Sequence, residues 1–225
     1  MIRLGSLYSG IAGLELGLLA AFVEAGIPAR VAWQCEIDPF ATSVLAQHFP
    51  DVQRFSDVAT VHNPPDVDVL CGGFACQDVS AAGKGAGLGI ETRSGFTLHH
   101  LLRIIDETRA RWLVIENVAS GAKRWLPRVV QELRSRGYRP RAVPLGAIDV
   151  GAPHRRQRVF VVADRTSGPR GEVGPAVCGD RERDVTRPSG ERGTRGPGGR
   201  GGAELAHTTN DRQEVEGERA FGTIA

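Results

Sequence analysis

Cys76 stands in a sequence context that suits a catalytic thiol. Residues 67–71 form an apolar run too short for a helix, between a Pro pair and a Gly pair, and are predicted to form a buried strand. Gly72 and Gly73 then turn the chain, which puts Cys76 at the carboxyl end of that strand. Open α/β sheets bind ligands at this edge. A thiol delivered there is a candidate nucleophile, although a lone cysteine is more often an inert small hydrophobe.

Charged side chains adjoin two later apolar runs. Glu116 directly follows the run 112–115, so we expect it at the same sheet edge as Cys76. A carboxyl group in an apolar setting can stay protonated, but a strand-end acid can equally be ion-paired. Arg156 and Arg158 alternate just before another apolar run and therefore share a face. Arginine holds carbonyl, phosphate or carboxylate groups, whereas many basic clusters are simply solvated surface.

A strand, a glycine-bearing turn and a helix open the chain. Residues 2–9 have strand character, Gly10 and Gly13 follow, and an apolar helix is predicted at 13–25. This order is typical of nucleotide-cofactor sites, because glycine lets the backbone approach a ligand and a helix amino end favours negative charge. Ala12 stands where a third glycine is expected, and a tight turn without a ligand would share the pattern.

Acidic residues follow the next strands. Glu36 ends the predicted strand 30–35 and lies roughly 20 residues beyond the glycines, a spacing suited to binding ribose hydroxyls. Asp38 and Asp57 also lie near strand ends. Either could instead cap a helix, which is the commoner role of an isolated aspartate.

Four sequence blocks occur in order between residues 2 and 164. They are YSGIAG at 8–13 with Glu36, GGFACQ at 72–77 with SAAGK at 80–84, ENV at 116–118, and PHRRQRVF at 153–160. Together they resemble the cofactor loop, the catalytic-cysteine loop, the glutamate motif and the arginine motif of the cytosine-5 DNA methyltransferases. Any one block could arise by chance, whereas all four in order are specific.

The resemblance implies a role for each candidate residue. Cys76 would add to carbon 6 of cytosine, so that carbon 5 can attack the methyl group of the cofactor. Glu116 would protonate or hydrogen-bond ring nitrogen N3, and Arg156 and Arg158 would hold the base carbonyl, a phosphate or the glutamate. The cofactor, S-adenosyl-L-methionine, is expected on Tyr8, Gly10, Gly13, Glu36 and Asp57.

The expected substrate is double-stranded DNA with a flipped cytosine, because carbon 5 cannot be reached inside a duplex. The segment after Cys76 suits a mobile lid, although a plain surface loop would also carry glycines. Its glycines and basic residues are Gly83, Lys84, Gly85, Gly87, Gly89 and Arg93. Methylation of RNA is an alternative, since a related branch of the family acts on transfer RNA.

Strands and helices alternate as far as Asp164, with helices expected at 13–25, 38–48, 95–109 and 121–136. This predicts an α/β fold with a doubly wound, mainly parallel sheet, and the resemblance implies the Rossmann-like methyltransferase type. Residues 1–164 would form the catalytic domain. Residues 165–225 are rich in Gly, Arg, Glu and Asp and are predicted to be a disordered tail.

The composition permits one sizeable core, with 225 residues and 41% hydrophobic content. The formal charge of +2 is too small to indicate a nucleic-acid partner by itself. We expect no membrane segment, no secretory leader and, from four cysteines without a CxxC pair, no metal site or disulfide. These expectations describe a reduced, cytoplasmic protein.

Residues 165–225 are the main departure from the family. Complete members continue with a target-recognition domain, a closing motif and a last helix, and nothing in this segment resembles them. We therefore expect a truncated chain or one half of a split enzyme completed by a second chain; an inactive remnant is the alternative. Three local departures are Ala75 for the usual proline, His154 for glutamine and Ser6 for an acid.

Overall fold

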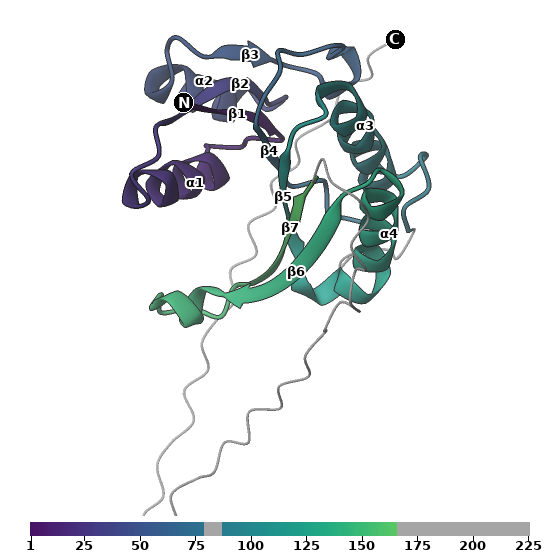
Figure 1. Cartoon of the computed structure of the whole chain (residues 1–225). Helices are drawn as coiled ribbons and strands as arrows, with labels where there is room; N and C mark the ends of the chain where they lie inside the picture. Colours follow the sequence, from purple (N-terminus) through teal and green to yellow (C-terminus); the bar gives the residue numbers. More distant parts are fainter. Residues whose placement is uncertain (79–86, 166–225) are drawn as a thin grey trace, which may run out of the picture. The chain divides into compact units, whose positions relative to one another are not determined.

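A computed structural model of the chain describes residues 1–78 and 87–165. Within these residues lies one seven-stranded sheet, and four α-helices connect its strands (Figure 1). The strands are β1 (Ile2–Leu7), β2 (Ala29–Cys35), β3 (Gln53–Phe55), β4 (Val69–Gly72), β5 (Trp112–Val118), β6 (Arg139–Gly146) and β7 (Gln157–Asp164). The helices are α1 (Gly13–Glu24), α2 (Pro39–His48), α3 (Arg93–Thr108) and α4 (Ala122–Ser135).

The strand order is β3-β2-β1-β4-β5-β7-β6. The first five strands in this order are parallel, and β7 runs antiparallel to both β5 and β6. The chain moves outward from β1 to β3 and then crosses back to β4, so the order reverses between β1 and β4. Ligands of doubly wound folds bind at the carboxyl ends of strands at this reversal. The predicted α/β fold with a mainly parallel sheet is confirmed.

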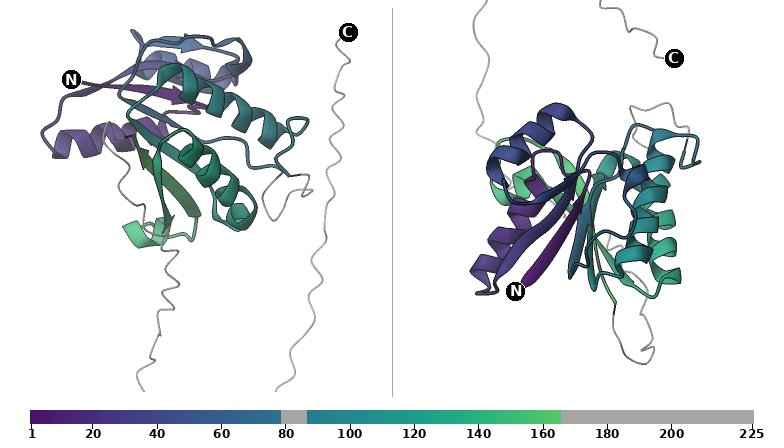
Figure 2. Two further views of the ribbon diagram at one scale, coloured as in Figure 1. Left: turned by 45° about the vertical axis from the view of Figure 1, so that its right-hand side comes forward. Right: turned by 90° about the horizontal axis from the view of Figure 1, so that it is seen from above.

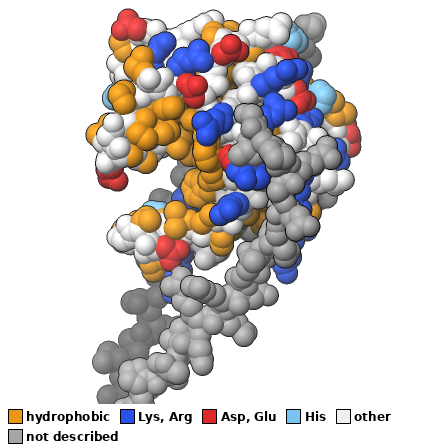
Figure 3. Space-filling model, in the orientation of Figure 1, with side chains coloured by type: hydrophobic (Ala, Val, Ile, Leu, Met, Phe, Trp, Pro, Cys, Tyr) orange, Lys and Arg blue, Asp and Glu red, His pale blue; other side chains and the backbone are white. Residues whose placement is uncertain are grey.

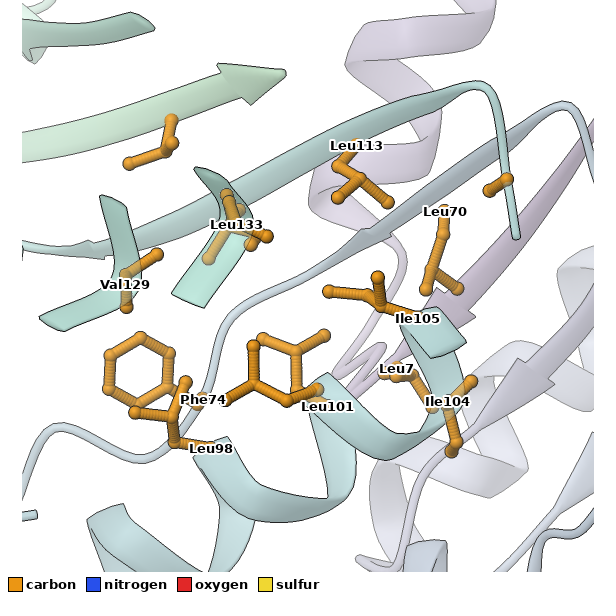
Figure 4. Packing of buried hydrophobic residues seen from close by; sticks show 14 of the residues in the cluster. Leu7, Leu70, Phe74, Leu98, Leu101, Ile104, Ile105, Leu113, Val129 and Leu133 are labelled. Atoms are coloured by element: carbon orange, nitrogen blue, oxygen red, sulfur yellow. The ribbon is translucent and has the colours of Figure 1, made fainter. Parts of the chain in front are cut away.

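The helices cover both faces of the sheet because strand side chains alternate in direction. Leu113 and Ile115 of β5 face α3 and α4, whereas Val114 belongs to the smaller cluster under α1. Figure 2 shows α1, in purple, and the teal helices α3 and α4 on opposite sides of the strands. Figure 4 shows the larger core, in which α3 and α4 pack on the sheet and on Phe74. Its labelled members are Leu7, Leu70, Phe74, Leu98, Leu101, Ile104, Ile105, Leu113, Val129 and Leu133.

Local capping explains where two helices begin. Thr92 is the N-cap of α3, and its Oγ1 accepts a hydrogen bond from Gly95 N at 3.0 Å. The helix therefore starts two residues earlier than the predicted residue 95. Asp38 caps α2 by accepting from Ala41 N at 2.8 Å. The capping alternative for Asp38 is thus correct.

Two predictions fall largely outside the described residues. The lid segment includes residues 79–86, and with them Gly83, Lys84 and Gly85; all but one residue of the predicted tail, 165–225, lies in 166–225. In the part of the chain that the structure describes, no helix has both the length and the apolar character needed to cross a membrane.

Candidate functional site

The turn after β1 has an unusual backbone. Tyr8, Gly10 and Ala12 have left-handed φ angles of 58°, 54° and 68°. Glycine adopts such angles freely, but tyrosine and alanine do so at a cost that other contacts must offset. Ala12, where glycine was expected, is fully buried and donates its N–H to Ser9 O at 2.9 Å. Strained non-glycine residues of this kind concentrate at ligand sites.

Glu36 ties this turn to the end of β2. Its Oε2 accepts a hydrogen bond from Gly10 N at 2.7 Å, and its Oε1 accepts from Asp38 N at 2.8 Å. Asp57 caps a short 3-10 turn, because its Oδ1 accepts from Ala59 N at 2.9 Å. Both carboxylates keep unused lone pairs, so these contacts leave them able to bind a ligand as well.

A pocket of about 450 Å³ opens beside these residues. That volume lies in the range of cofactor and small-ligand sites. It is lined by Tyr8, Cys35, Glu36, Ile37, Ser56, Asp57, Val58, Gly73, Ala75, Arg93, Phe96 and Thr97. Tyr8 reaches across to α3, where its hydroxyl donates to Thr97 O at 2.7 Å. Burial, together with the nearby Cys35, raises the pKa of Tyr8, which therefore remains a neutral hydrogen-bond donor.

The loop that carries Cys76 is fastened on both sides to the first turns of α3. On one side Ala75 N donates to Thr97 Oγ1 at 3.0 Å. On the other, Asp78 and Ser94 exchange two hydrogen bonds: Asp78 N donates to Ser94 Oγ at 3.1 Å, and Ser94 N donates to Asp78 Oδ2 at 2.8 Å. These hydrogen bonds brace the short segment that contains Cys76. Cys76 itself is half-buried, so this residue is partly exposed to solvent.

The other two described cysteines are less suited to nucleophilic chemistry. Cys35 and Cys71 are buried. Burial, with a contribution from Glu36, raises the pKa of Cys35 to about 12. Burial also raises the pKa of Cys71. A thiol with a raised pKa has little thiolate at neutral pH, and thiolate is the nucleophilic form.

Glu116 lies directly against the cysteine loop. A Cβ added at Gly73 would lie 2.9 Å from Glu116 Oε2 and 3.1 Å from Glu116 O, so a larger residue here would require the Glu116 side chain to move and the backbone to shift slightly. Asn117, the next residue, is 2% exposed and donates from Nδ2 to Phe74 O at 3.0 Å. The sequence blocks contain Asn117 but gave no reason to assign it a role.

Glu116 forms an ion pair with Arg158, with 2.5 Å between Oε1 and Nε. The two residues lie on adjacent antiparallel strands, where Glu116 is opposite Phe160 and Arg158 is opposite Val118. The ion-paired alternative therefore describes Glu116 in this structure. Arg156 precedes β7, is exposed, and forms no side-chain hydrogen bond or ion pair with another described residue.

The structure thus brings most of the predicted residues to one edge of the sheet. Tyr8, Glu36 and Asp57 line the pocket, and Gly73 joins that pocket to Glu116 and to the Cys76 loop. Two predicted cofactor residues are not part of the lining: Gly10, whose N–H donates to Glu36, and Gly13, the first residue of α1. Within residues 1–78 and 87–165, no group of His, Cys, Asp and Glu side chains could hold a metal ion.

Comparison with known proteins places this arrangement in a family. Residues 2–177 match the family model of the C-5 cytosine-specific DNA methylases. The chain belongs to this family. Methylases related to it include M2.BsuMI of Bacillus subtilis, a type II methyltransferase that is 33% identical over 180 residues, and M.NlaIV of Neisseria lactamica, 29% identical over 181 residues. The matches cover 75% of this chain but only 43% and 42% of those methyltransferases.

Solved structures of other proteins share the fold of this chain. The DNMT2 of Spodoptera frugiperda has a TM-score of 0.58 at 22% identity, and the S. pombe Dnmt2 methyltransferase has 0.59 at 20%. Each comparison covers 74% of this chain and 51% of the other. This chain therefore spans about half the length of these proteins, and less than half that of the curated relatives.

The residues present fit the cofactor of a methylase. Methyltransferases of this family use S-adenosylmethionine, which has a ribose, an adenine and a charged methionine part. No other atom lies within 4 Å of the Cβ positions of Gly10 and Gly13, so a ligand could approach the backbone there. Glu36 and Asp57 provide acceptors for hydroxyl or amino groups, and Ile37, 64% exposed, provides apolar surface for a base.

Proposed function

We propose that this chain carries the cofactor site and the catalytic cysteine of an enzyme that transfers a methyl group from S-adenosylmethionine to carbon 5 of cytosine in DNA. The position of Gly73 is the observation that supports this most strongly. Gly73 lines the pocket, lies three residues before Cys76, and is so close to Glu116 that an added Cβ would lie 2.9 Å from Oε2 and 3.1 Å from the carbonyl oxygen. The methyl donor, the thiol and the carboxyl group would therefore meet around one glycine.

Cys76 and Glu116 share the activation of the base. The Cys76 thiolate adds to carbon 6, forming a carbon–sulfur bond and making carbon 5 nucleophilic. Glu116 is a carboxylate in its ion pair with Arg158 and can then only accept, so it must take up a proton when the base binds before it can donate a hydrogen bond to N3. Carbon 5 then takes the methyl group that S-adenosylmethionine supplies. Loss of the carbon 5 proton and departure of the thiolate restore the ring.

Arg158 and Arg156 have different roles in this proposal. Arg158 holds the Glu116 carboxyl group against Gly73 before the base arrives, as their ion pair indicates. Arg156 is exposed at the start of β7 and is assigned to a DNA phosphate or the base carbonyl. Lys84, which lies outside the described residues, is assigned to phosphate contacts.

We also propose that a second chain, carrying the target-recognition part, completes the enzyme. On the sheet face opposite α3 and α4, the apolar cluster under α1 reaches Val114 of β5 and includes no described residue of β6 or β7. The exposed apolar side chains of β5, β6 and β7 are Trp112, Val143, Leu145 and Val162, with Leu16 and Val23 on the neighbouring α1. Figure 3 shows hydrophobic side chains around the hollow between α1 and the β6–β7 hairpin. An apolar face of this kind favours association with another polypeptide.

A methyl-transfer assay tests the proposed function. Tritiated S-adenosylmethionine is supplied with duplex DNA or RNA, to this chain alone and to the chain with a candidate recognition subunit. We expect the chain with the recognition subunit to place label at carbon 5 of cytosine in DNA. The Cys76→Ser protein should place none. Label at another position, or in RNA only, would contradict the proposal.

Calorimetry tests the cofactor site separately. Glu36→Ala removes the acceptor that shapes the glycine turn, so S-adenosylhomocysteine should bind at least roughly tenfold more weakly. Glu24→Ala, at the exposed end of α1, is the matched control. Equal affinity in the Glu36→Ala protein and the parent would disprove this assignment.

A further inference from the structure

A buried carboxyl group that the proposed chemistry does not use lies beneath the cofactor turn. Glu15 of α1 and Gln34 of β2 are both 0% exposed. Gln34 Nε2 donates to Glu15 Oε1 over a long distance of 3.5 Å. Among the described residues, two buried side-chain atoms have no hydrogen-bond partner, Glu15 Oε2 and Gln34 Oε1. The two unpaired atoms thus belong to side chains that already touch each other.

The chemistry of the two groups indicates how both atoms are satisfied. If Glu15 is ionised, Oε2 and Gln34 Oε1 are both acceptors and cannot pair. Rotating the Gln34 amide by 180° exchanges its nitrogen and oxygen, but its oxygen would then face the other carboxylate oxygen of Glu15, which is also an acceptor. If Glu15 is protonated on Oε2, that O–H donates to Gln34 Oε1 while Gln34 Nε2 donates to Oε1. The acid and the amide then close a ring of two hydrogen bonds, which leaves neither atom unpaired.

The surroundings of Glu15 favour the neutral form. Burial raises the pKa of Glu15, and the nearby Ser6 hydroxyl, its own N–H, the Ser9 hydroxyl and the Gln34 amide offset this only in part. The other titratable group that faces it is the Cys71 thiol of β4. No described cation forms an ion pair with it, and the amino end of α1 is the positive field that opposes protonation.

We propose that Glu15 is a neutral carboxylic acid in the folded protein and that its pair with Gln34 is a positioning device for the cofactor turn. Glu15 is the third residue of α1, just beyond the turn, and Gln34 precedes two residues that hold the turn from the other side. Cys35 O accepts from Ser9 N at 3.2 Å, and Glu36 accepts from Gly10 N. The pair therefore joins the two segments that keep a strained backbone in place.

The consequence for pH follows from the raised pKa. Stability from the pair is complete below the unfolded-state pKa and is lost as pH rises through the folded-state pKa. Glu15→Gln cannot ionise and keeps an amide–amide pair. The parent protein should therefore lose stability relative to Glu15→Gln as the pH is raised, and never gain it.

Infrared spectroscopy tests the protonation state without cofactor or DNA, and so independently of the proposed function. The difference spectrum between the parent and Glu15→Gln in D₂O near neutral pH should contain the C=O stretch of a protonated carboxyl group. The matched control, Glu24→Gln at the other end of α1, should remove only carboxylate bands. A carboxylate signal from Glu15 would overturn the proposal.

The positioning role rests on the proposed cofactor site and needs a second measurement. S-adenosylhomocysteine affinity and thermal unfolding are followed from about pH 5 to about pH 9. The parent should lose affinity with rising pH and Glu15→Gln should not, while Gln34→Leu, which leaves the acid unpartnered, should bind roughly tenfold more weakly. The exchange Glu15→Gln with Gln34→Glu restores one acid and one amide and should bind like the parent at low pH.

Two outcomes would overturn the positioning role. One is the same pH dependence of affinity in the parent and Glu15→Gln. The other is that Gln34→Leu and all the other variants bind S-adenosylhomocysteine as tightly as the parent, although the infrared spectrum shows that Glu15 is protonated. If no variant binds S-adenosylhomocysteine while the infrared band is present, the proposed cofactor site fails, and the positioning role with it, but the neutral acid stands.

Discussion

The side-chain amide of Asn117 donates to the backbone carbonyl of Phe74 at 3.0 Å and so joins the strand that carries Glu116 to the loop that carries Cys76. Phe74 is itself fixed, because its ring packs edge-on against Trp125 with centroids 5.7 Å apart. Trp125 Nε1 in turn donates to Val118 O at 3.0 Å. The end of β5, the start of α4 and the cysteine loop therefore form one braced unit.

Asn117→Ala should weaken this unit. The Phe74 carbonyl would be left without its partner in a buried position, which costs about 1–3 kcal/mol of unfolding free energy. Denaturant unfolding measures the loss. Gln131→Ala, an amide removed from the exposed face of α4, is the control and should change stability by less than about 0.5 kcal/mol. Equal effects of the two substitutions would rule out the bracing role.

Gly73→Ala should separate the cysteine loop from Glu116. The new methyl group would lie 2.9 Å from Glu116 Oε2 and 3.1 Å from the Glu116 carbonyl oxygen, so the side chain would have to move and the central strand β5 would have to shift by a few tenths of an ångström. We expect a stability loss of about 1–3 kcal/mol and a fall in methyl transfer of at least roughly tenfold. Gly17→Ala on α1 meets no atom within 4 Å and is the control. Full activity in the Gly73→Ala protein would contradict the proposed closeness of the two groups.

Thr97→Val tests whether a hydrogen bond stabilises the cysteine loop at Ala75, where the family usually has proline. Alanine leaves an N–H that proline lacks, and Thr97 Oγ1 accepts it at 3.0 Å. Losing this bond should cost about 1 kcal/mol in the parent. In an Ala75→Pro background no N–H is present, so Thr97→Val should cost little there. A double-mutant cycle by denaturant unfolding measures the difference, and additive effects would show that the bond contributes nothing.

The part of the fold that could be predicted from the sequence has strong apolar patterning. The strands around residues 2–9, 30–35, 67–71 and 112–115 follow from apolar runs, and the four helices lie close to the expected ranges 13–25, 38–48, 95–109 and 121–136. The edge strand β6 escaped prediction because Arg139, Pro140, Arg141 and Pro144 lack that pattern; proline is tolerated on an edge strand, where backbone N–H groups need no ladder partner. The three-residue strand β3 is too short to show a period.

The candidate site shows a similar division. Residues that follow a strand, such as Glu36 and Glu116, could be placed because parallel strands end at one edge. Partners such as Thr97, which is 22 residues from Ala75, could not be predicted, because the two residues come together only in the folded chain and the local sequence does not mark the contact. The sequence named Glu116 as one possible partner of Arg156 and Arg158, but the choice of Arg158 depends on an antiparallel register that the alternation of strands and helices did not reveal.

Covalent trapping on DNA that contains 5-fluorocytosine tests the central claim most directly. Fluorine at carbon 5 cannot leave as a proton does, so the adduct formed after methyl transfer should persist. The chain is incubated with S-adenosylmethionine and the DNA, with a candidate recognition subunit present, beside Cys76→Ser and the control Cys71→Ser, a buried thiol that does not line the pocket. We predict a denaturation-resistant complex in the parent and in Cys71→Ser, and none in Cys76→Ser. A complex of equal yield from Cys76→Ser would contradict the account.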